Sequence, residues 1–433
     1  VRRLNRRAVE LAILAGLALE CDISAYSHMD RKHYFYPDLP KGYQLSQADE
    51  PLCRGGHLVI GAGGETRRVR IARIHLEEDA GKLTHTAGGT RLDCNRCGVP
   101  LIEVVSEPDL RSGAEAAAYL RELRAVLLAC GVSDCKMQEG SLRCDVNLSV
   151  RRVGEETLGT RTEIKNINSF SFVEKAIAFE AARQIAELKQ TGRVRQRTMR
   201  YNASSGRTEV MREKEQAADY RFLREPDVPE LFISRETVER LRRELPELPA
   251  ARRARLQKSY GMSADDAAVL TATPGLSEFF EQAAEMSGYP ALVLHLLLTD
   301  LLRLCSGEPF ASPVSPGQLA ELADLAGEGS VNRSTAKQLL PRLTRSDASP
   351  RELAARENLT QISDRAQLAA WVEQAMAEQP RSVADYRNGK TNALRALQGR
   401  LMALSRGRAN PVLAEQMLRG RLDQTNQEED EHV

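Results

Sequence analysis

The sequence predicts an α+β fold, with a β-rich cradle domain followed by an all-α helical domain and a small helical tail. Up to about residue 235, short segments of alternating polarity are separated by glycine-rich turns, which is typical of half-buried strands. After Pro246 this pattern disappears and apolar residues recur with helical spacing. At 433 residues the chain also exceeds one ordinary domain. We therefore expect domains at 1–245, 246–360 and 361–433.

The composition is that of a globular chain without a strong overall charge. Hydrophobic residues make up 42% and charged residues 28%, as in ordinary globular domains. Lys plus Arg total 61 and Asp plus Glu total 60, so any basic surface must be local. No apolar run reaches the roughly 18 residues that cross a bilayer. Eight cysteines in a chain this long favour a reducing cytoplasm over a disulfide framework.

The first predicted element is an amphipathic helix within residues 1–22, rather than a signal peptide. Because the chain opens almost directly in this helix, we expect further sequence upstream. Two strands at 57–60 and 68–76 follow, joined by a glycine-rich turn, and a third lies at 101–106.

Two helices follow in the first domain. A capping box at 112–115 begins a helix that ends at Gly131. A second box at 171–174 begins a helix that ends near Gly192, with Val173, Ile177, Ala181, Ile185 and Leu188 on its apolar face.

The stretch between these helices, 137–170, predicts a β-hairpin with strands at 141–151 and 160–166. In the first strand, apolar residues alternate with Arg143, Asp145 and Asn147. In the second, Arg161, Glu163 and Lys165 share one side. Such a face is either the solvated side of an antiparallel sheet or a binding site for a charged ligand. The presence of both positive and negative side chains would suit such a site.

The remaining elements are helices. Helical periods cover 256–304, with a break at 288–290, and 316–343. Three or so further helices are expected between 364 and 422.

Acidic residues gather where two predicted strands end. The strand at 68–76 runs into three consecutive carboxylates at 77–79. Downstream, the spacing of Glu103 and Glu107 places them on one strand face, and Asp109 follows. Hard oxygen ligands without matching His/Cys pairs suit Mg²⁺, which leaves positions for phosphate oxygens. The alternative is a set of surface acids.

Two further features carry alternatives. Cys94 and Cys97 are spaced like half of a zinc site, which Cys130, Cys135 or Cys144 could complete, although the spacing of the second pair does not match. An aromatic run at 33–43 is either a recognition loop or a core-packing loop.

The C-terminal tail carries a local positive charge. Between 381 and 422 there are nine basic residues and two acids, which gives a net charge of 9 − 2 = +7. This excess favours a surface for a nucleic-acid phosphate backbone. The alternative is a solvated helical face.

Several blocks of the sequence resemble a known family. LDCNRCGVPLIEVVSEPD at 92–109 is similar to the signature of the B subunit of the aspartyl/glutamyl-tRNA amidotransferase. The blocks RKHYFYPDLPKGYQ, HLEEDAGK, QEGSLRCDVN, GTRTEIKNINSF and REPDVPEL are similar to that family's blocks, in its order. The resemblance continues through NGKTNALRALQGRLM and RGRANP, and so covers essentially the whole chain.

The resemblance implies a two-step reaction in a bacterial-type cytoplasm, with ATP and Mg²⁺ as cofactors. The family binds tRNA(Gln) or tRNA(Asn) that is misacylated with Glu or Asp. ATP phosphorylates the side-chain carboxylate, and ammonia displaces the phosphate to form the amide. The amidase (A) subunit supplies this ammonia from glutamine, and a small C subunit completes the heterotrimer. Which route the cell uses, Asn, Gln or both, depends on its synthetases.

The resemblance also implies roles for individual residues. We expect the metal at Glu78 and Glu103, and a route for ammonia along His75, Glu77 and Lys82. We expect catalytic roles for a set of charged residues, namely Glu77, Asp79, Lys82, Arg143, Asp145, Glu163 and Lys165. Contacts to ATP are expected from Asn147, Arg161 and Asn166. Contacts to tRNA are expected from Arg387, Lys390, Arg395, Arg406 and Arg408.

One departure leaves alternatives open. The family begins with a strand that carries a Gly-Leu-Glu-Val-His block, whose Glu and His complete the metal site, and this chain starts after that block. A non-catalytic tRNA-binding or scaffold protein is therefore the second hypothesis. A zinc-dependent hydrolase, which rests on the cysteines alone, is the third.

Overall fold

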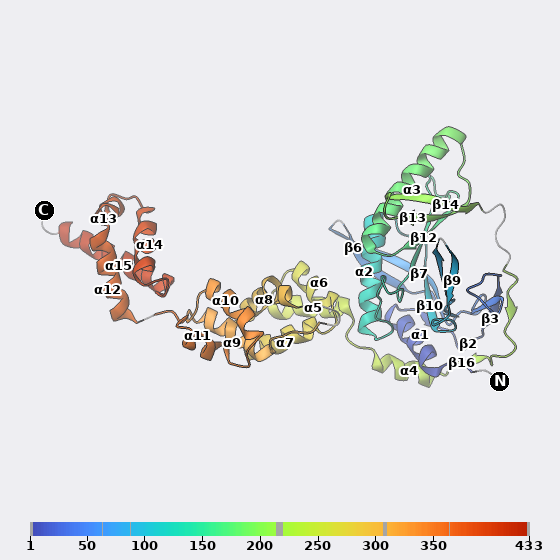
Figure 1. Ribbon diagram of the computed structural model, residues 1–433, viewed down its shortest axis with the longest axis horizontal. Helices are drawn as coiled ribbons and strands as arrows, with labels where there is room; N and C mark the ends of the chain where they lie inside the picture. The colour runs from blue at the N-terminus through green and yellow to red at the C-terminus, as the bar shows by residue number, and fades with distance from the viewer. Residues whose placement is uncertain are drawn as a thin grey trace. The chain divides into compact units, whose positions relative to one another are not determined.

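The computed structural model describes residues 3–62, 64–86, 88–213, 220–305, 310–362 and 364–430 (Figure 1). The chain forms two compact units, residues 1–252 and 253–433. The first unit combines strands and helices, and the second is helical in its described part, apart from a bridge between Ile362 and Ala409. The α+β fold class is thus confirmed. The further division of the second unit at residue 360 stays a prediction.

The first unit is built on one long strand, β7 (Glu65–Glu78). Its antiparallel neighbours are β5 (Cys53–Arg54), β6 (His57–Ala62) and β10 (Pro100–Ser106), and β1 (Asp22–Ile23) pairs with β5. Val69, Ile71 and Ile74 on β7 are buried, so this strand anchors the hydrophobic core.

Small sheets complete this part of the unit. Their strands are β2 (Tyr26–Ser27) with β16 (Leu231–Phe232), β3 (Asp30–His33) with β4 (Tyr43–Ser46) and β15 (Leu223–Arg224), and β8 (Lys82–Thr86) with β9 (Gly89–Asp93).

Three long helices cover the core. In α1 (Arg6–Ala18), Asn5 caps the N-terminus by accepting hydrogen bonds from the amides of Arg7 and Ala8. Figure 1 shows α2 (Gly113–Ala129) and α3 (Phe170–Thr191) side by side. A Cβ atom on Gly113 would lie only 3.0 Å from the Cα atom of Glu174, so glycine permits this close crossing. A shorter helix, α4 (Arg235–Glu244), packs against α1.

The predicted hairpin strands are part of a larger sheet. β11 (Cys144–Leu148) and β12 (Thr162–Ile167) are antiparallel, as predicted, although the first strand is shorter than 141–151. β12 then pairs in parallel with β13 (Arg197–Asn202), which pairs with β14 (Arg207–Glu213). The connection from β12 to β13 contains α3, the crossover that parallel strands require.

The prediction for α3 was wrong in two details. The N-cap is Ser169, whose hydroxyl accepts from the amide of Phe172, and not Ser171. The buried face includes Glu180 and Gln184, whereas Ile185 is exposed. The ion pair from Arg183 and the hydrogen bonds from Thr162 and Thr208 allow Glu180 to be buried. Gly192 ends the helix in the left-handed conformation, as predicted.

The second unit contains two buried apolar clusters. The first involves α5 (Pro249–Tyr260), α6 (Ala264–Ala272), α7 (Leu276–Met286), α8 (Pro290–Thr299), the 3₁₀ turn η1 (Leu301–Leu304), α9 (Pro316–Gly327), α10 (Arg333–Leu343) and α11 (Pro350–Arg356). The second involves α12 (Arg365–Glu378), α13 (Pro380–Arg387), α14 (Ala393–Leu404) and α15 (Pro411–Asp430). The break predicted at 288–290 separates α7 from α8. In the part of the chain that the structure describes, none of the helices is long and apolar enough to cross a membrane.

Candidate active site

The site begins with one imidazole and two carboxylates on adjacent strands. His75 lies opposite Glu103 in the β7–β10 register, and Glu77 is two residues further along β7. The Nε2 atom of His75 is 3.5 Å from Oε2 of Glu103 and 3.9 Å from Oε2 of Glu77. Because side chains alternate along a strand, all three share one face of the sheet.

The surroundings shift the pKa values of the two carboxylates in opposite directions. Burial raises the pKa of Glu77, and the negative charge of Glu103 adds to this effect. The hydrogen bond from His75 lowers the pKa of Glu103, which outweighs its burial. Nδ1 of His75 is buried without a hydrogen-bond partner among the described residues. Within those residues, these three side chains form the group whose ligand atoms lie close enough to hold a metal ion.

Lys32 and Tyr34 were not predicted as site residues, although Tyr34 lies in the aromatic run at 33–43. The positive charge of Lys32 lowers the pKa of both Glu77 and Glu103, so its ammonium lies near the cluster. That ammonium also lies 4.8 Å from the ring centre of Tyr220. Burial raises the pKa of Tyr34 to about 12, and the charges of Asp38 and Glu77 contribute. The only signal in the sequence was a lysine beside an unusual concentration of aromatics.

Asp79, directly after β7, binds Arg143, which directly precedes β11 of the four-stranded sheet. Its side chain is 2% exposed, and Arg143 Nη2 contacts both carboxylate oxygens at 2.5 Å. Arg96 Nε is 2.9 Å from Oδ2 of the same carboxylate. The charge of Arg143 also lowers the pKa of Glu77. The structure therefore brings the predicted residues Asp79 and Arg143 together next to the cluster.

Lys165, on β12 of the four-stranded sheet, lies between two carboxylates. Its Nζ atom lies 2.8 Å from Asp145 and 3.2 Å from Glu163. Burial lowers the pKa of Lys165, but the two carboxylates outweigh burial and keep it above its usual value. The positive charge of Lys165 lowers the pKa of Tyr34, and the negative charge of Glu77 raises it, so both groups lie near the same ring.

The predicted metal pair, Glu78 and Glu103, is not brought together. Glu78 follows Glu77 on β7 and therefore lies on the opposite face of the sheet. There it forms an ion pair with Lys41 and accepts a hydrogen bond of 2.9 Å from the amide of Leu45.

The remaining predicted residues of this unit are exposed where their side chains are described. Lys82 is exposed at the start of β8, and Asn147 is exposed on β11. Arg161 is exposed just before β12. The side chain of Asn166 lies outside the described residues.

The cysteines of the zinc alternative are not gathered into one site. Cys94 is exposed and Cys97 is half-buried, in a turn between β9 and β10. Cys130 and Cys135 are buried in the hydrophobic core, and burial raises the pKa of Cys144 to about 12. No zinc ligand set with these cysteines occurs within the described ranges.

In the tail, some of the predicted charge is compensated. Arg400 pairs with Glu378, and Arg421 pairs with Glu373 at 2.6 Å; both acids lie on α12, before the window that gave +7. Lys390 pairs with Asp385 at 2.9 Å. Arg395, Arg406 and Arg408 are exposed.

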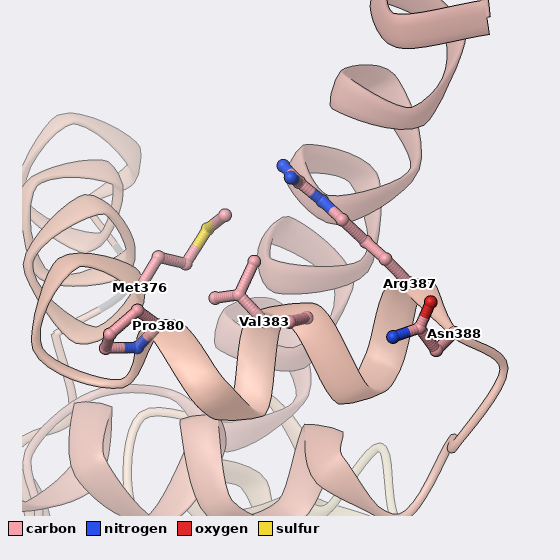
Figure 2. A pocket seen from close by; sticks show the side chains of 6 residues that line it. Met376, Pro380, Val383, Arg387 and Asn388 are labelled. Carbon is pink, nitrogen blue, oxygen red and sulfur yellow. The ribbon is translucent and has the colours of Figure 1, made fainter.

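A shallow hollow of about 490 Å³ also lies in the tail. Figure 2 shows it between Met376 and Pro380 at one end and Arg387 and Asn388 at the other, with Val383 between them. Arg387 is thus the predicted tRNA-binding residue that lines a concave surface.

Comparisons with known protein families identify the class of protein to which this chain belongs. Residues 2–239 match the family described as the GatB/GatE catalytic domain, and residues 278–422 match the family described as the GatB domain. The first match contains the whole cluster and both of its cationic neighbours, Arg143 and Lys165.

Relatives then specify the family. The chain is 47% identical to the B subunit of the aspartyl/glutamyl-tRNA(Asn/Gln) amidotransferase from Moorella thermoacetica, over 97% of this chain and 90% of the relative. It is 44% identical to the same subunit from Carboxydothermus hydrogenoformans, over 97% of this chain and 89% of the relative. It is 46% identical to that from Anaeromyxobacter sp., with the same coverages, 97% and 89%. The chain belongs to this family of amidotransferase B subunits.

Proposed function

We propose that this chain is the subunit that activates the misacylated tRNA. It phosphorylates the side-chain carboxylate of Glu-tRNA(Gln) or Asp-tRNA(Asn) with ATP and supports amidation by ammonia from glutamine. The observation that carries the proposal is the cluster of His75, Glu77 and Glu103, which lies beside Arg143 and Lys165 within the matched catalytic domain. A carboxylate becomes a good electrophile only once it is phosphorylated, so such a site must hold several anions together.

The donor set fits a divalent cation. We retain Glu103 from the sequence prediction and propose Glu77 as its partner, since these oxygens and the His75 imidazole converge within 4.8 Å. Glu103 is half exposed, so its carboxylate is open to solvent and to a ligand. Mg²⁺ bound there would neutralise phosphate charge.

The cations would position the reacting groups. Arg143 and Lys165 already bind carboxylates, those of Asp79, Asp145 and Glu163. A phosphate or substrate carboxylate can take the place of one such partner, and these side chains are then preorganised for the developing charge. We propose that Asn147, Arg161 and Asn166 contact ATP.

Ammonia must reach the acyl phosphate without loss to water. His75 and Glu77 are largely buried and adjacent, so they can pass ammonia between polar groups toward the site. Lys82, at the exposed end of β8, would lie at the entrance. The amidase and C subunits are the proposed partners in the cytoplasm, and the exposed arginines of the tail are the proposed tRNA contacts.

Reconstitution tests the proposal. The chain is mixed with A and C subunits, Glu-tRNA(Gln), ATP, Mg²⁺ and glutamine, and Gln-tRNA(Gln) is measured after deacylation. We expect product in the complete mixture and none without ATP. Intact tRNA binding without product would contradict a catalytic role and favour a scaffold.

A pair of variants tests whether the cluster is required for the phosphorylation step. Glu103→Gln should abolish formation of the acyl phosphate and leave tRNA affinity unchanged, because it alters the cluster and not the tail. Glu65→Gln, at the exposed opposite end of β7, is the matched control and should behave as the wild type. Normal turnover by Glu103→Gln would refute the assignment.

A further inference from the structure

The turn between β9 and β10 places two cysteines on either side of a residue of the candidate active site. The amide of Cys97 donates a hydrogen bond of 3.0 Å to the carbonyl of Cys94. A turn closed in this way holds its first and fourth Cα atoms within about 7 Å. A disulfide requires roughly 4.4–6.8 Å between the same atoms. The backbone therefore already holds the two cysteines close to the separation of a disulfide.

The thiols are in contact and accessible. The Cys94 side chain is a hydrogen-bond partner of Cys97, and burial and this contact raise the pKa of Cys97. Cys94 is exposed and Cys97 is half-buried, whereas Cys21, Cys53 and Cys130 are buried. An external reagent reaches Cys94 first, and Cys97 is the nearest thiol to resolve what forms there.

We propose that Cys94 and Cys97 form a reversible disulfide, which makes this turn a redox-sensitive site. The sulfur of Cys94 attacks a small-molecule or protein disulfide, R–S–S–R, and one R–SH leaves. The sulfur of Cys97 then attacks the mixed disulfide, the new S–S bond forms, and the second R–SH leaves. The two cysteines are oxidised by two electrons, R–S–S–R is reduced, and both thiol protons end on the released thiols.

A metal site accounts for the pair less well. Structural zinc takes four ligands from the protein. Among the described His, Cys, Asp and Glu side chains, the group that could hold a metal is His75, Glu77 and Glu103, and it contains neither cysteine. Two adjacent sulfurs without further ligands fit a disulfide.

The turn is connected to the active site through Arg96. This residue lies between the cysteines and binds Asp79, and the amide of Gly98 donates a hydrogen bond of 2.9 Å to the Asp79 carbonyl. Asp79 in turn binds Arg143, which directly precedes β11. Closure of the disulfide restrains the turn that carries Arg96 and fixes the position of this side chain against Asp79, so we infer that oxidation slows amidation. This second step rests on the proposed function.

Peptide mapping tests the disulfide. The full chain is equilibrated with mixtures of oxidised and reduced glutathione, alkylated and digested with trypsin, which cleaves after Arg91, Arg96 and Arg111. We expect peptides 92–96 and 97–111 to be joined after oxidation and separate after reduction. Cys94→Ser and Cys97→Ser should each abolish the joined species, and Cys305→Ser, the half-buried control, should keep it. Absence of the joined species at full oxidation, or stoichiometric zinc that Cys94→Ser loses, would overturn the proposal.

Amidation rates of the assembled complex test whether oxidation of Cys94 and Cys97 slows the reaction. Amidation should fall several-fold on oxidation, recover on reduction, and be insensitive to oxidation in Cys94→Ser. An unchanged rate despite complete joining of the peptides would overturn the coupling and leave the disulfide standing. A reduced complex without amidation would instead refute the proposed function, and the peptide map would still decide the disulfide.

Discussion

At the scale of single residues, adjacent glutamates have different surroundings because a strand alternates its faces. Glu77 points to the cluster with His75 and Glu103, and Glu78 points to Lys41 on the other side. Glu103→Gln should therefore weaken binding of a divalent cation by about tenfold or more, whereas Glu78→Gln should leave it nearly unchanged. Calorimetric titration of each variant with Mg²⁺ measures this difference. Equal losses in both variants would return the metal to the pair predicted from the sequence.

The residues of the site were predictable to different degrees. Carboxylates at 77–79 and 103 and the charged face at 143–165 follow from strand alternation, a local property. The ion pair of Asp79 with Arg143 joins positions 64 residues apart, and it depends on how two sheets pack, which local spacing does not encode. Lys32 and Tyr34 were missed for the same reason. In the tail, Glu373 and Glu378 compensate arginines from outside the window in which charges were summed.

At the scale of secondary-structure elements, a buried carboxylate attaches α3 to its sheet. Glu180 is fully buried and accepts hydrogen bonds from Thr162 on β12, Thr208 on β14 and Arg183 on its own helix. A sequence interpretation based on apolar spacing found Val173 on this face, but it could not find Glu180 and Gln184, because these buried members are polar. The strands and helices were otherwise predictable where alternation, capping or glycine marked them.

This carboxylate gives the first unit a specific pH dependence. Burial raises the pKa of Glu180, but the hydrogen bond and charge of Arg183 outweigh it, so the pKa lies below its ordinary value of 4.5. The stabilisation is therefore complete above pH 4.5 and is lost as pH falls through the lowered pKa. Glu180→Gln should destabilise this unit by roughly 3–5 kcal/mol at pH 7. It should also flatten the dependence of unfolding free energy on pH below 4.5.

Circular dichroism during denaturation, repeated across pH, measures the change. The single tryptophan, Trp371, lies in the second unit, so its fluorescence serves as an internal control that should not shift. A variant as stable as the wild type at pH 7 would show that the network contributes little.

Two glycines in helices should respond in opposite directions to alanine. At Gly113 the added Cβ would lie 3.0 Å from the backbone of α3, so Gly113→Ala should destabilise the first unit by about 1–3 kcal/mol. At Gly420 on α15 nothing lies within 4 Å, so Gly420→Ala should stabilise the second unit by about 0.5–1 kcal/mol. Circular dichroism for the first and Trp371 fluorescence for the second measure these effects. A neutral Gly113→Ala would mean that α2 and α3 can separate without cost.

At the scale of the whole molecule, the proposed active-site cluster belongs to one unit, and the arginines proposed to contact tRNA belong to the other. Arg406 and Arg408 are exposed in the loop before α15, where Gly407 also has a positive φ of 76°. Among the described residues neither guanidinium forms an ion pair with an acid, and both are exposed, so both are available to phosphates. The +7 of the tail thus overstates its available charge, because Arg400 and Arg421 already bind acids of α12.

The difference between exposed arginines and ion-paired arginines predicts different salt dependences of tRNA binding. Replacing Arg406 and Arg408 together by Ala should weaken tRNA binding and reduce the slope of log K against log salt by about 1–2, as expected for the loss of one or two phosphate contacts. Arg400→Ala removes an equally charged side chain that is bound to Glu378, and it should change the slope little. Filter binding of tRNA(Gln) across a salt series compares the three proteins. Because the cluster lies in the other unit, formation of the acyl phosphate at saturating tRNA should be the same in all of them. An unchanged slope in the double variant would show that these arginines form a solvated face and that tRNA is held elsewhere on the chain.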